Sequence, residues 1–337
     1  MTRLSRQALF VAPEPTTGSP PEPSPSRPAA ASTPARRPPA GPETGSSLRR
    51  RPVPPLPPAP GRLRLRWWRV IVGTILAALI AVTGPASVSA ASDTDPTEPG
   101  PYAVDSATIS RWDAFGFGGG AVFTPIAAPG LRPVVAISPG FSAPGRTLHW
   151  LGRHLAGHGY VVVVIDTLTL VDPPSSRSLQ LLAALDHVTT RGPEPARSLA
   201  DPDRRAVIGH SMGGGGALGA GAVRPSLDAV IALQPWALDW TWGNVTSPTL
   251  VIGADNDLTA PANVYALPFA TTLGGEHAYL EIDAGHLVSI SFDPNTARFS
   301  VWWLQRFLDD DQAAGTELCD GDHAYDKVLI WRDTCPF

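Results

Sequence analysis

The sequence has 337 residues, and its net charge of −4 is the sum of two regions of opposite charge. Residues 1–69 carry 12 Arg and 3 Glu, a net charge of +9, whereas residues 91–337 carry 14 basic and 27 acidic side chains, a net charge of −13. The second region is long enough to form one sizeable hydrophobic core or two small ones. Its acidity argues against a nucleic-acid partner, because binding to a phosphate backbone requires a basic surface.

The first 69 residues have the composition of a segment without a folded core. Residues 1–60 contain 17 of the 38 prolines, and Ser, Ala, Thr and Gly fill most of the gaps between them. Because so few of these side chains can bury apolar surface, burial cannot offset the entropy that folding would remove. We therefore predict a disordered Pro/Arg-rich extension over residues 1–69.

Residues 62–91 follow the order of a secretory signal. A basic stretch at 62–69 leads into an apolar run at 70–82, and small residues follow up to Ala91. This order predicts a signal region over residues 70–90, cleavage before Ala91 and a secreted protein with no stable membrane partner. The alternative is a membrane anchor, although the 13 apolar residues fall short of the roughly 20 that a spanning helix needs. The long basic region indicates either a mis-assigned start or a cytoplasmic extension.

The two cysteines, Cys319 and Cys335, lie downstream of this export pattern. In an oxidising compartment they are expected to form a disulfide, which would close a loop of about 15 residues and stabilise the fold by about 3 kcal/mol in the loop-entropy model. The alternative is a pair of free thiols. Neither cysteine has a spacing typical of a zinc site, so the sequence indicates no transition metal.

Short apolar runs alternate with helical patterns along residues 91–337. One or two edge strands are expected at 91–120. Six nearly continuous, β-branched runs then have the pattern of strands buried on both faces of a parallel sheet, at 133–138, 160–166, 205–209, 229–233, 249–253 and 278–282. Helical patterns lie at 148–157, 176–190, 212–223 and 296–308. The alternation predicts an α/β fold, with a mostly parallel, doubly wound sheet and flanking helices, in a single domain over residues 91–337.

The segment Gly209-His-Ser-Met-Gly213 directly follows the predicted strand at 205–209 and opens the predicted helix at 212–223. In this context the G-x-S-x-G pattern predicts a nucleophile elbow, a turn so tight that the flanking positions must lack side chains. The pattern alone is weak, and the alternative is an ordinary serine at a Gly-rich helix start. At a helix N-terminus Ser211 would also lie beside backbone amides that stabilise negative charge.

A serine nucleophile needs a histidine base and a carboxylate that orients the histidine. In α/β-hydrolases both residues follow the serine along the chain, each after a later strand. His286 follows the strand at 278–282 and is the predicted base, because the other histidines outside the motif precede it or lie on a helix, before a strand or between the cysteines. Asp255 and Asp257 both follow the strand at 249–253, and the pattern leaves the choice between them open.

Motifs spread over residues 138–337 resemble those of the secreted bacterial cutinases and polyester hydrolases that include the PET-degrading enzymes. They are Ser-Pro-Gly-Phe at 138–141, Ile-Asp-Thr at 165–167, Pro-Ser-Ser-Arg at 174–177, the Gly-rich elbow at 209–216, Pro-Trp at 235–236, the acidic loop at 255–261 and Thr-Cys-Pro-Phe at 334–337. The resemblance implies an α/β-hydrolase fold and a carboxylic ester hydrolase. It also implies that Asp257, which is followed by Leu-Thr-Ala-Pro, is the acid of a Ser-His-Asp triad.

The resemblance extends to residues around the predicted triad. The backbone amides of Phe141 and Met212 would form the oxyanion hole, and the side chains of Phe141, Trp236 and Leu287 would contact the substrate. Simple core packing is the alternative for Phe141 and Trp236. Leu287 stands where relatives commonly have Phe or Ser, so the shape of the cleft is left open.

Some relatives bind Ca²⁺ through three acidic positions beside the site. Here Asp255 and Asp283 match two of them, but Leu329 stands where the third carboxylate would be. An alkyl side chain cannot replace a hard oxygen ligand. We therefore expect no metal site, and the predicted chemistry needs no cofactor.

The leading hypothesis is a secreted, monomeric serine esterase that acts on cutin, a triacylglycerol, or an aliphatic or aromatic polyester. No insertion is long enough for a helical lid, and an open groove would favour extended chains. A second hypothesis keeps the triad but assigns small soluble esters or lactones as substrates. A third, from another class, is a catalytically silent binding protein of the cell wall, because a fold alone does not establish a function.

Overall fold

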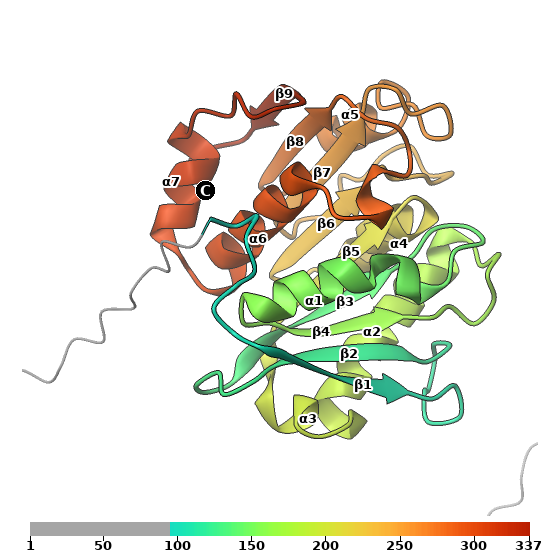
Figure 1. The fold of residues 1–337 in the computed structure, drawn as a ribbon. Helices are drawn as coiled ribbons and strands as arrows, with labels where there is room; N and C mark the ends of the chain where they lie inside the picture. The colour runs from blue at the N-terminus through green and yellow to red at the C-terminus, as the bar shows by residue number, and fades with distance from the viewer. Residues whose placement is uncertain (1–94) are drawn as a thin grey trace, which may run out of the picture. The chain divides into compact units, whose positions relative to one another are not determined.

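The computed structural model describes residues 95–337. The predictions of a disordered extension at 1–69 and of a signal region at 70–90 lie outside the described residues. The described chain forms one nine-stranded sheet with the order β1-β2-β4-β3-β5-β6-β7-β8-β9 and helices on both faces (Figure 1). This arrangement confirms the predicted α/β-hydrolase fold.

Six parallel strands form the centre of the sheet, and each coincides with one of the predicted apolar runs. They are β3 (Arg132–Ser138), β4 (Val161–Ile165), β5 (Ala200–His210), β6 (Ala229–Leu233), β7 (Thr249–Ala254) and β8 (His277–Ile282). Every residue of β4, β6 and β7 is buried. The sequences of such strands are continuous apolar runs because helices cover both faces of the sheet.

The edges of the sheet are antiparallel. β1 (Val104–Ile109) pairs with β2 (Gly120–Pro125), β2 pairs with β4, and at the other edge β9 (Val328–Asp333) pairs with β8. β1 was expected as an edge strand, whereas β9 was not predicted. No residue of β9 is fully buried, so this strand lacks the continuous apolar pattern that identified the others.

Helices cover the two faces of the sheet and enclose two hydrophobic clusters. On one face lie α1 (His149–Gly157), α6 (Pro294–Leu308) and α7 (Gln312–Asp320), and on the other lie α2 (Pro174–Arg191), α4 (Met212–Val223) and α5 (Ala266–Thr271) (Figure 1). Short helices at η1 (Gly145–Leu148), α3 (Ala196–Leu199) and η2 (Val288–Ile290) complete the connections. The four predicted helices correspond to α1, α2, α4 and α6.

Helices α6 and α7 begin where an aspartate caps the first turn. The Asp293 carboxylate accepts a hydrogen bond from the Thr296 amide at 2.7 Å, and Pro294 occupies the first helical position. The Asp311 carboxylate accepts from the Ala313 amide at 2.8 Å. Such caps satisfy amides that have no partner inside the helix, and this explains why α6 starts two residues before the predicted range.

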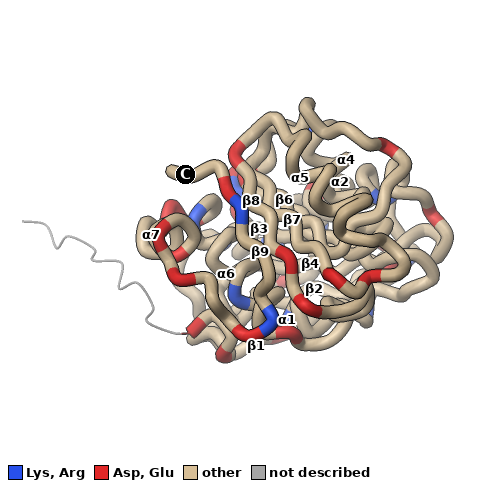
Figure 2. Tube along the Cα trace, turned by 90° about the horizontal axis from the view of Figure 1, so that it is seen from above, with Lys and Arg blue, Asp and Glu red and all other residues tan. Residues whose placement is uncertain are grey.

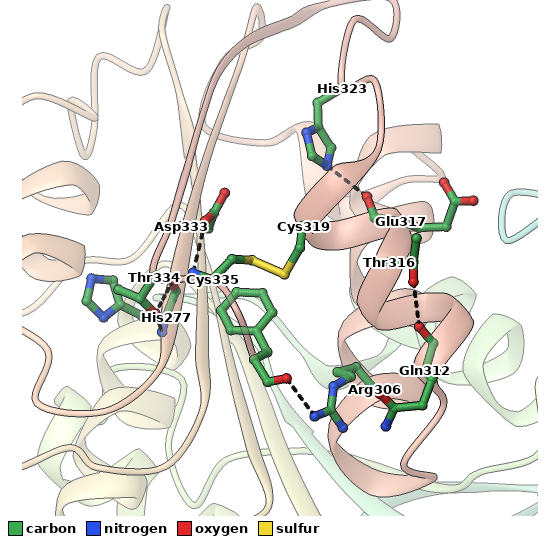
Figure 3. The surroundings of a disulfide bond; sticks show 11 residues. His277, Arg306, Gln312, Thr316, Glu317, Cys319, His323, Asp333, Thr334 and Cys335 are labelled. Atoms are coloured by element: carbon green, nitrogen blue, oxygen red, sulfur yellow. Dashed lines mark hydrogen bonds between the residues drawn. A yellow bond between two sulfur atoms is a disulfide. The ribbon is translucent and has the colours of Figure 1, made fainter.

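A disulfide joins the C-terminal segment to α7. Cys319 on α7 bonds to Cys335, which follows β9, and Figure 3 shows the bond with its surroundings. Close by, Arg306 of α6 donates a hydrogen bond to the carbonyl oxygen of Phe337 at 2.9 Å. The predicted pairing of the two cysteines is confirmed, and the bond fixes the segment after β9 against the helices of this face.

Acidic positions are distributed over much of the described chain. In the view of Figure 2 the red acidic positions are more frequent than the blue basic ones, as expected from the 14 basic and 26 acidic side chains of residues 95–337. Within this same range, no helix is both long enough and apolar enough to cross a membrane.

Candidate active site

Ser211 lies in the turn between β5 and α4. Its backbone has φ 56° and ψ −120°, a conformation that costs a non-glycine residue on the order of 1–3 kcal/mol. The turn has no space for flanking side chains: a Cβ on Gly209 would overlap the carbonyl oxygen of Gly213, and a Cβ on Gly213 would overlap the carbonyl oxygens of Ser138 and Pro139. The G-x-S-x-G pattern therefore reflects steric exclusion at both glycines.

Backbone hydrogen bonds hold this strained turn in place. The Ser211 amide donates to the Leu233 carbonyl at the end of β6 (2.9 Å), and the Ser211 carbonyl accepts from the amides of Gly215 (3.1 Å) and Trp236 (2.9 Å). The serine is thus fixed to a neighbouring strand, to the first turn of α4 and to the loop after β6. Its hydroxyl has a defined position at the carboxyl edge of the sheet.

The three predicted catalytic side chains meet at this edge, each from a different loop. The Ser211 Oγ atom lies 2.9 Å from His286 Nε2, and His286 Nδ1 lies 2.7 Å from Asp257 Oδ2. Asp257 follows β7 and His286 follows β8. The side chain of His286 is 11% exposed and that of Asp257 is fully buried, so solvent reaches the imidazole but not the carboxylate behind it.

The environment of Asp257 favours the charged carboxylate. Its Oδ1 atom accepts hydrogen bonds from the amides of Thr259 (2.8 Å) and Ala260 (2.7 Å), and its Oδ2 atom is bonded to His286. Burial alone would raise the pKa of Asp257, but the hydrogen bonds from His286 and from these two amides outweigh burial and lower it. Asp255, the alternative acid, is exposed, so the structure brings Asp257 to His286, as the resemblance implied.

His210 is a residue of the site to which sequence reasoning assigned no role. It is buried at the end of β5, and its Nε2–H donates to the carbonyl oxygen of His286 at 2.8 Å. Burial lowers the pKa of His210 to about 4, so the ring is neutral at pH 7. His210 thus fixes the backbone that carries the imidazole of His286. Its place beside Ser211 in the motif was the only signal available from the sequence.

The remaining histidines have other contacts. Four donate a hydrogen bond from a ring nitrogen to a backbone carbonyl oxygen: His154 to Pro96, His158 to Glu98, His277 to Gly275 and His323 to Glu317. The other two lie edge-on to phenylalanine rings, His149 to Phe123 and His187 to Phe117. None of these contacts involves the three residues of the candidate triad.

Several apolar side chains on the loops next to Ser211 and His286 are accessible to solvent. Phe141 is 54% exposed and Leu287 is 60% exposed, so core packing does not account for Phe141. Trp236 is half-buried, and its ring lies 6.3 Å from that of Tyr265, which in turn stacks on Trp240 at 5.5 Å. Phe141 follows β3 and Met212 is the first residue of α4, which places both backbone segments at the same edge of the sheet as Ser211.

The acidic residues beside the site do not form a set of metal ligands. Asp255 is exposed, the Asp283 carboxylate accepts a hydrogen bond from the Asn256 side chain at 2.8 Å, and Leu329 offers only an alkyl group. In the part of the chain from 95 to 337, no group of three or more His, Cys, Asp or Glu side chains is arranged to hold a metal ion.

The described chain has a cavity of about 630 Å³ that Ser211, Asp257 and His286 do not line. It runs between α1 and the segment before β1, and its walls include Tyr102, Trp150 and Phe292. None of the residues that line it belongs to the candidate triad. The chemistry of the three converging side chains, rather than this volume, therefore identifies the site.

Comparison with known proteins gives consistent matches over most of the chain. A family model described as PETase: PET hydrolase-like matches residues 81–336. Cutinase 1 of Thermobifida cellulosilytica is 44% identical over 247 residues, which cover 71% of this chain and 92% of that protein. Bis(hydroxyethyl) terephthalate hydrolase of Streptomyces coelicolor is 41% identical over 305 residues, which cover 82% of this chain and 96% of that protein.

Proposed function

Because the chain belongs to the PET hydrolase-like family, we propose that it hydrolyses carboxylic esters through an acyl-enzyme formed on Ser211. His286 is the general base and Asp257 is the carboxylate that orients it. The observation that carries this proposal is the pair of hydrogen bonds through one imidazole, 2.9 Å to the Ser211 hydroxyl and 2.7 Å to the Asp257 carboxylate. These are the contacts that turn a weakly nucleophilic hydroxyl into an attacking group.

Acylation begins when Ser211 Oγ attacks the ester carbonyl carbon while His286 Nε2 accepts the hydroxyl proton. The bond to Asp257 keeps the proton of the neutral imidazole on Nδ1, so that Nε2 is free to act as a base. Negative charge develops on the former carbonyl oxygen, where the amides of Phe141 and Met212 donate to it. As the intermediate collapses, His286 returns the proton to the leaving alcohol, and the acyl group remains on Ser211.

Deacylation repeats these steps with water as the nucleophile. His286 removes a proton from water, which attacks the acyl carbon, and the same two amides stabilise the second tetrahedral intermediate. Proton return to Ser211 Oγ releases the carboxylic acid. The buried, hydrogen-bonded Asp257 carboxylate stabilises the imidazolium that forms in both halves of the reaction.

Replacing the nucleophile tests this mechanism directly. Ser211→Ala should lower kcat for p-nitrophenyl butyrate by roughly 10⁴-fold or more, and a fluorophosphonate probe should label the unsubstituted protein but not this variant. Ser247→Ala is the control, because Ser247 is also buried but its hydroxyl is bonded to the Pro225 carbonyl, away from the triad. Equal activity of Ser211→Ala and the unsubstituted chain would disprove the proposal.

The substrate class that we propose is a polyester or a terephthalate ester. Two relatives are named for cutin and for bis(hydroxyethyl) terephthalate, and the exposed Phe141 and Leu287 side chains beside the triad suit an apolar acyl or aromatic group. Release of acid from a polyester film should therefore accompany hydrolysis of short esters. Activity confined to short soluble esters would contradict this assignment while leaving the acyl-enzyme mechanism intact.

We further propose that the protein acts outside the cytoplasm. The basic, apolar and small-residue order of residues 62–91 supports export. The Cys319–Cys335 disulfide supports it independently, because such bonds persist in oxidising compartments.

A further inference from the structure

Arg177 is a buried cation that the mechanism above does not use. It lies in the first turn of α2 and has no exposed surface. Its guanidinium donates to three backbone carbonyls: Nε to Asp172 (2.8 Å), Nη1 to Pro139 (2.9 Å) and Nη2 to Leu170 (3.1 Å). No carboxylate in the described chain forms an ion pair with it. Burying a charge is costly, and the three carbonyls offset this cost together with the charge of the nearby Asp172 carboxylate, which favours the protonated guanidinium.

The hydrogen bonds of Arg177 reach the chain on either side of Phe141, whose backbone amide is a predicted donor of the oxyanion hole. Pro139 lies two residues before Phe141 and is bonded to the guanidinium directly. Ser142, the residue after Phe141, donates its amide to the Leu170 carbonyl at 2.8 Å, the same oxygen that accepts from Arg177. One guanidinium therefore fixes the chain on both sides of the Phe141 amide, once directly and once through Leu170.

The segment that contains Leu170 is itself held rigidly. The Asp172 carboxylate accepts hydrogen bonds from the Thr169 amide (3.0 Å) and from the Gln180 side chain (2.8 Å). On the other side of α2, helix α4 packs so closely that a Cβ on Gly216 would lie 2.8 Å from Arg177 Cβ. Arg177 is thus enclosed by α4 and by the loop at 168–172, with few alternative positions for its side chain.

We propose that Arg177 is a positioning residue that holds the turn at 139–142, so that the Phe141 N–H points at the oxyanion of the tetrahedral intermediate. This role rests on the proposed ester hydrolysis. The planar guanidinium can donate to three carbonyls at once, whereas an ammonium group is a point charge without this fork geometry. Burial lowers the pKa of Arg177 to about 10, and the group therefore stays protonated at neutral pH.

The test compares Arg177→Lys and Arg177→Met with the unsubstituted full chain. A displaced oxyanion donor should lower kcat by about 10- to 100-fold with little change in KM, because the lost interaction exists in the transition state. The inhibition constant of an alkylboronic acid, which forms a tetrahedral adduct on the serine, should rise in step with the fall in kcat. A residue that only stabilises the fold would change neither quantity below the unfolding temperature.

Arg224→Met is the matched control. Arg224 forms two hydrogen bonds, at 2.8 and 2.7 Å, to Asp186 on the same helix as Arg177, far along the chain from the turn at 139–142. This variant should lose stability but keep kcat and boronic acid affinity. If Arg177→Lys behaves like Arg224→Met, the positioning role is wrong.

Asp172→Asn keeps the proposal testable if the Arg177 variants do not fold. This change weakens the loop that carries Leu170 and should lower kcat several-fold with unchanged KM, so an unaltered kcat would overturn the proposal. The esterase activity and the positioning role of Arg177 can be disproved separately. If the unsubstituted chain has no esterase activity, both proposals are wrong. If the chain is active but its kcat does not change in Arg177→Lys, only the positioning role is wrong.

Discussion

At the scale of single residues, two buried imidazoles connect the pH of the medium to the stability of the fold. His158 and His210 are 9% and 3% exposed, and each donates Nε2–H to a backbone carbonyl, of Glu98 and of His286 respectively. Burial is the main cause that lowers the pKa of each ring to about 4. Both rings are therefore neutral in the folded protein throughout the range from pH 5 to 8.

Acidification should accordingly destabilise the protein before its carboxylates titrate. Unfolding returns each imidazole to its ordinary pKa of about 6.5, so between pH 6.5 and pH 4 the unfolded state binds protons that the folded state does not. Stability is complete above pH 6.5 and falls as the pH decreases through this window. For both histidines together, the free energy of unfolding should be lower by roughly 4 kcal/mol at pH 5 than at pH 7.5.

Urea unfolding at these two pH values measures the effect. His158→Gln retains an N–H donor for the Glu98 carbonyl but does not titrate, so this variant should lose roughly 2 kcal/mol less stability on acidification than the unsubstituted chain. An identical loss in the variant and in the unsubstituted chain would show that His158 does not contribute.

At the scale of elements, the close approach of α4 to the loop after β3 makes Gly213 sensitive to substitution. A Cβ at this position would overlap the carbonyl oxygens of Ser138 and Pro139, and backbone atoms cannot move aside as a flexible side chain can. Gly213→Ala should therefore lower the free energy of unfolding by roughly 2 kcal/mol or more. It should also lower kcat, because the displaced loop leads to Phe141.

Gly219→Ala, in the same helix, provides the comparison. A Cβ on Gly219 would mainly contact the hydroxyl of Ser178, which can rotate, and alanine is favoured over glycine in a helix interior by about 1 kcal/mol. Its stability should stay within about 1 kcal/mol of the unsubstituted protein in urea unfolding. Equal losses in the two variants would contradict the steric explanation for Gly213.

The sequence predicted those strands and helices that have a clear pattern of apolar residues within their own segment. The six parallel strands were found because each is buried on both faces, and α7 and β9 were missed because most of their residues are exposed or half-buried.

Ser211 and His286 could be identified from motif and chain order. Asp255 and Asp257 lie on one loop, and only the family resemblance or the fold separates them. Arg177 bonds to backbone carbonyls of other segments. Because every residue has a backbone carbonyl, such contacts have no signature in the sequence, and the role of Arg177 could not be predicted.

At the scale of the whole molecule, the proposed export predicts a specific mature form. Cleavage before Ala91 would remove the basic residues 1–69 and leave a chain with a net charge of −13. Esterase activity should appear in the culture medium, carried by a protein whose N-terminal sequence begins near Ala91. A chain that stays with the cells and retains residues 1–69 would instead favour the anchored alternative.

The strand order also affects how the sheet is completed during synthesis. A ribosome releases β8, which ends at Ile282, well before its partner β9 begins at Val328. In that interval β8 has one unpaired edge, and exposed edges of this kind pair readily with strands of neighbouring nascent chains. The last strand therefore covers this edge only when the chain is essentially complete, and the Cys319–Cys335 bond then secures it.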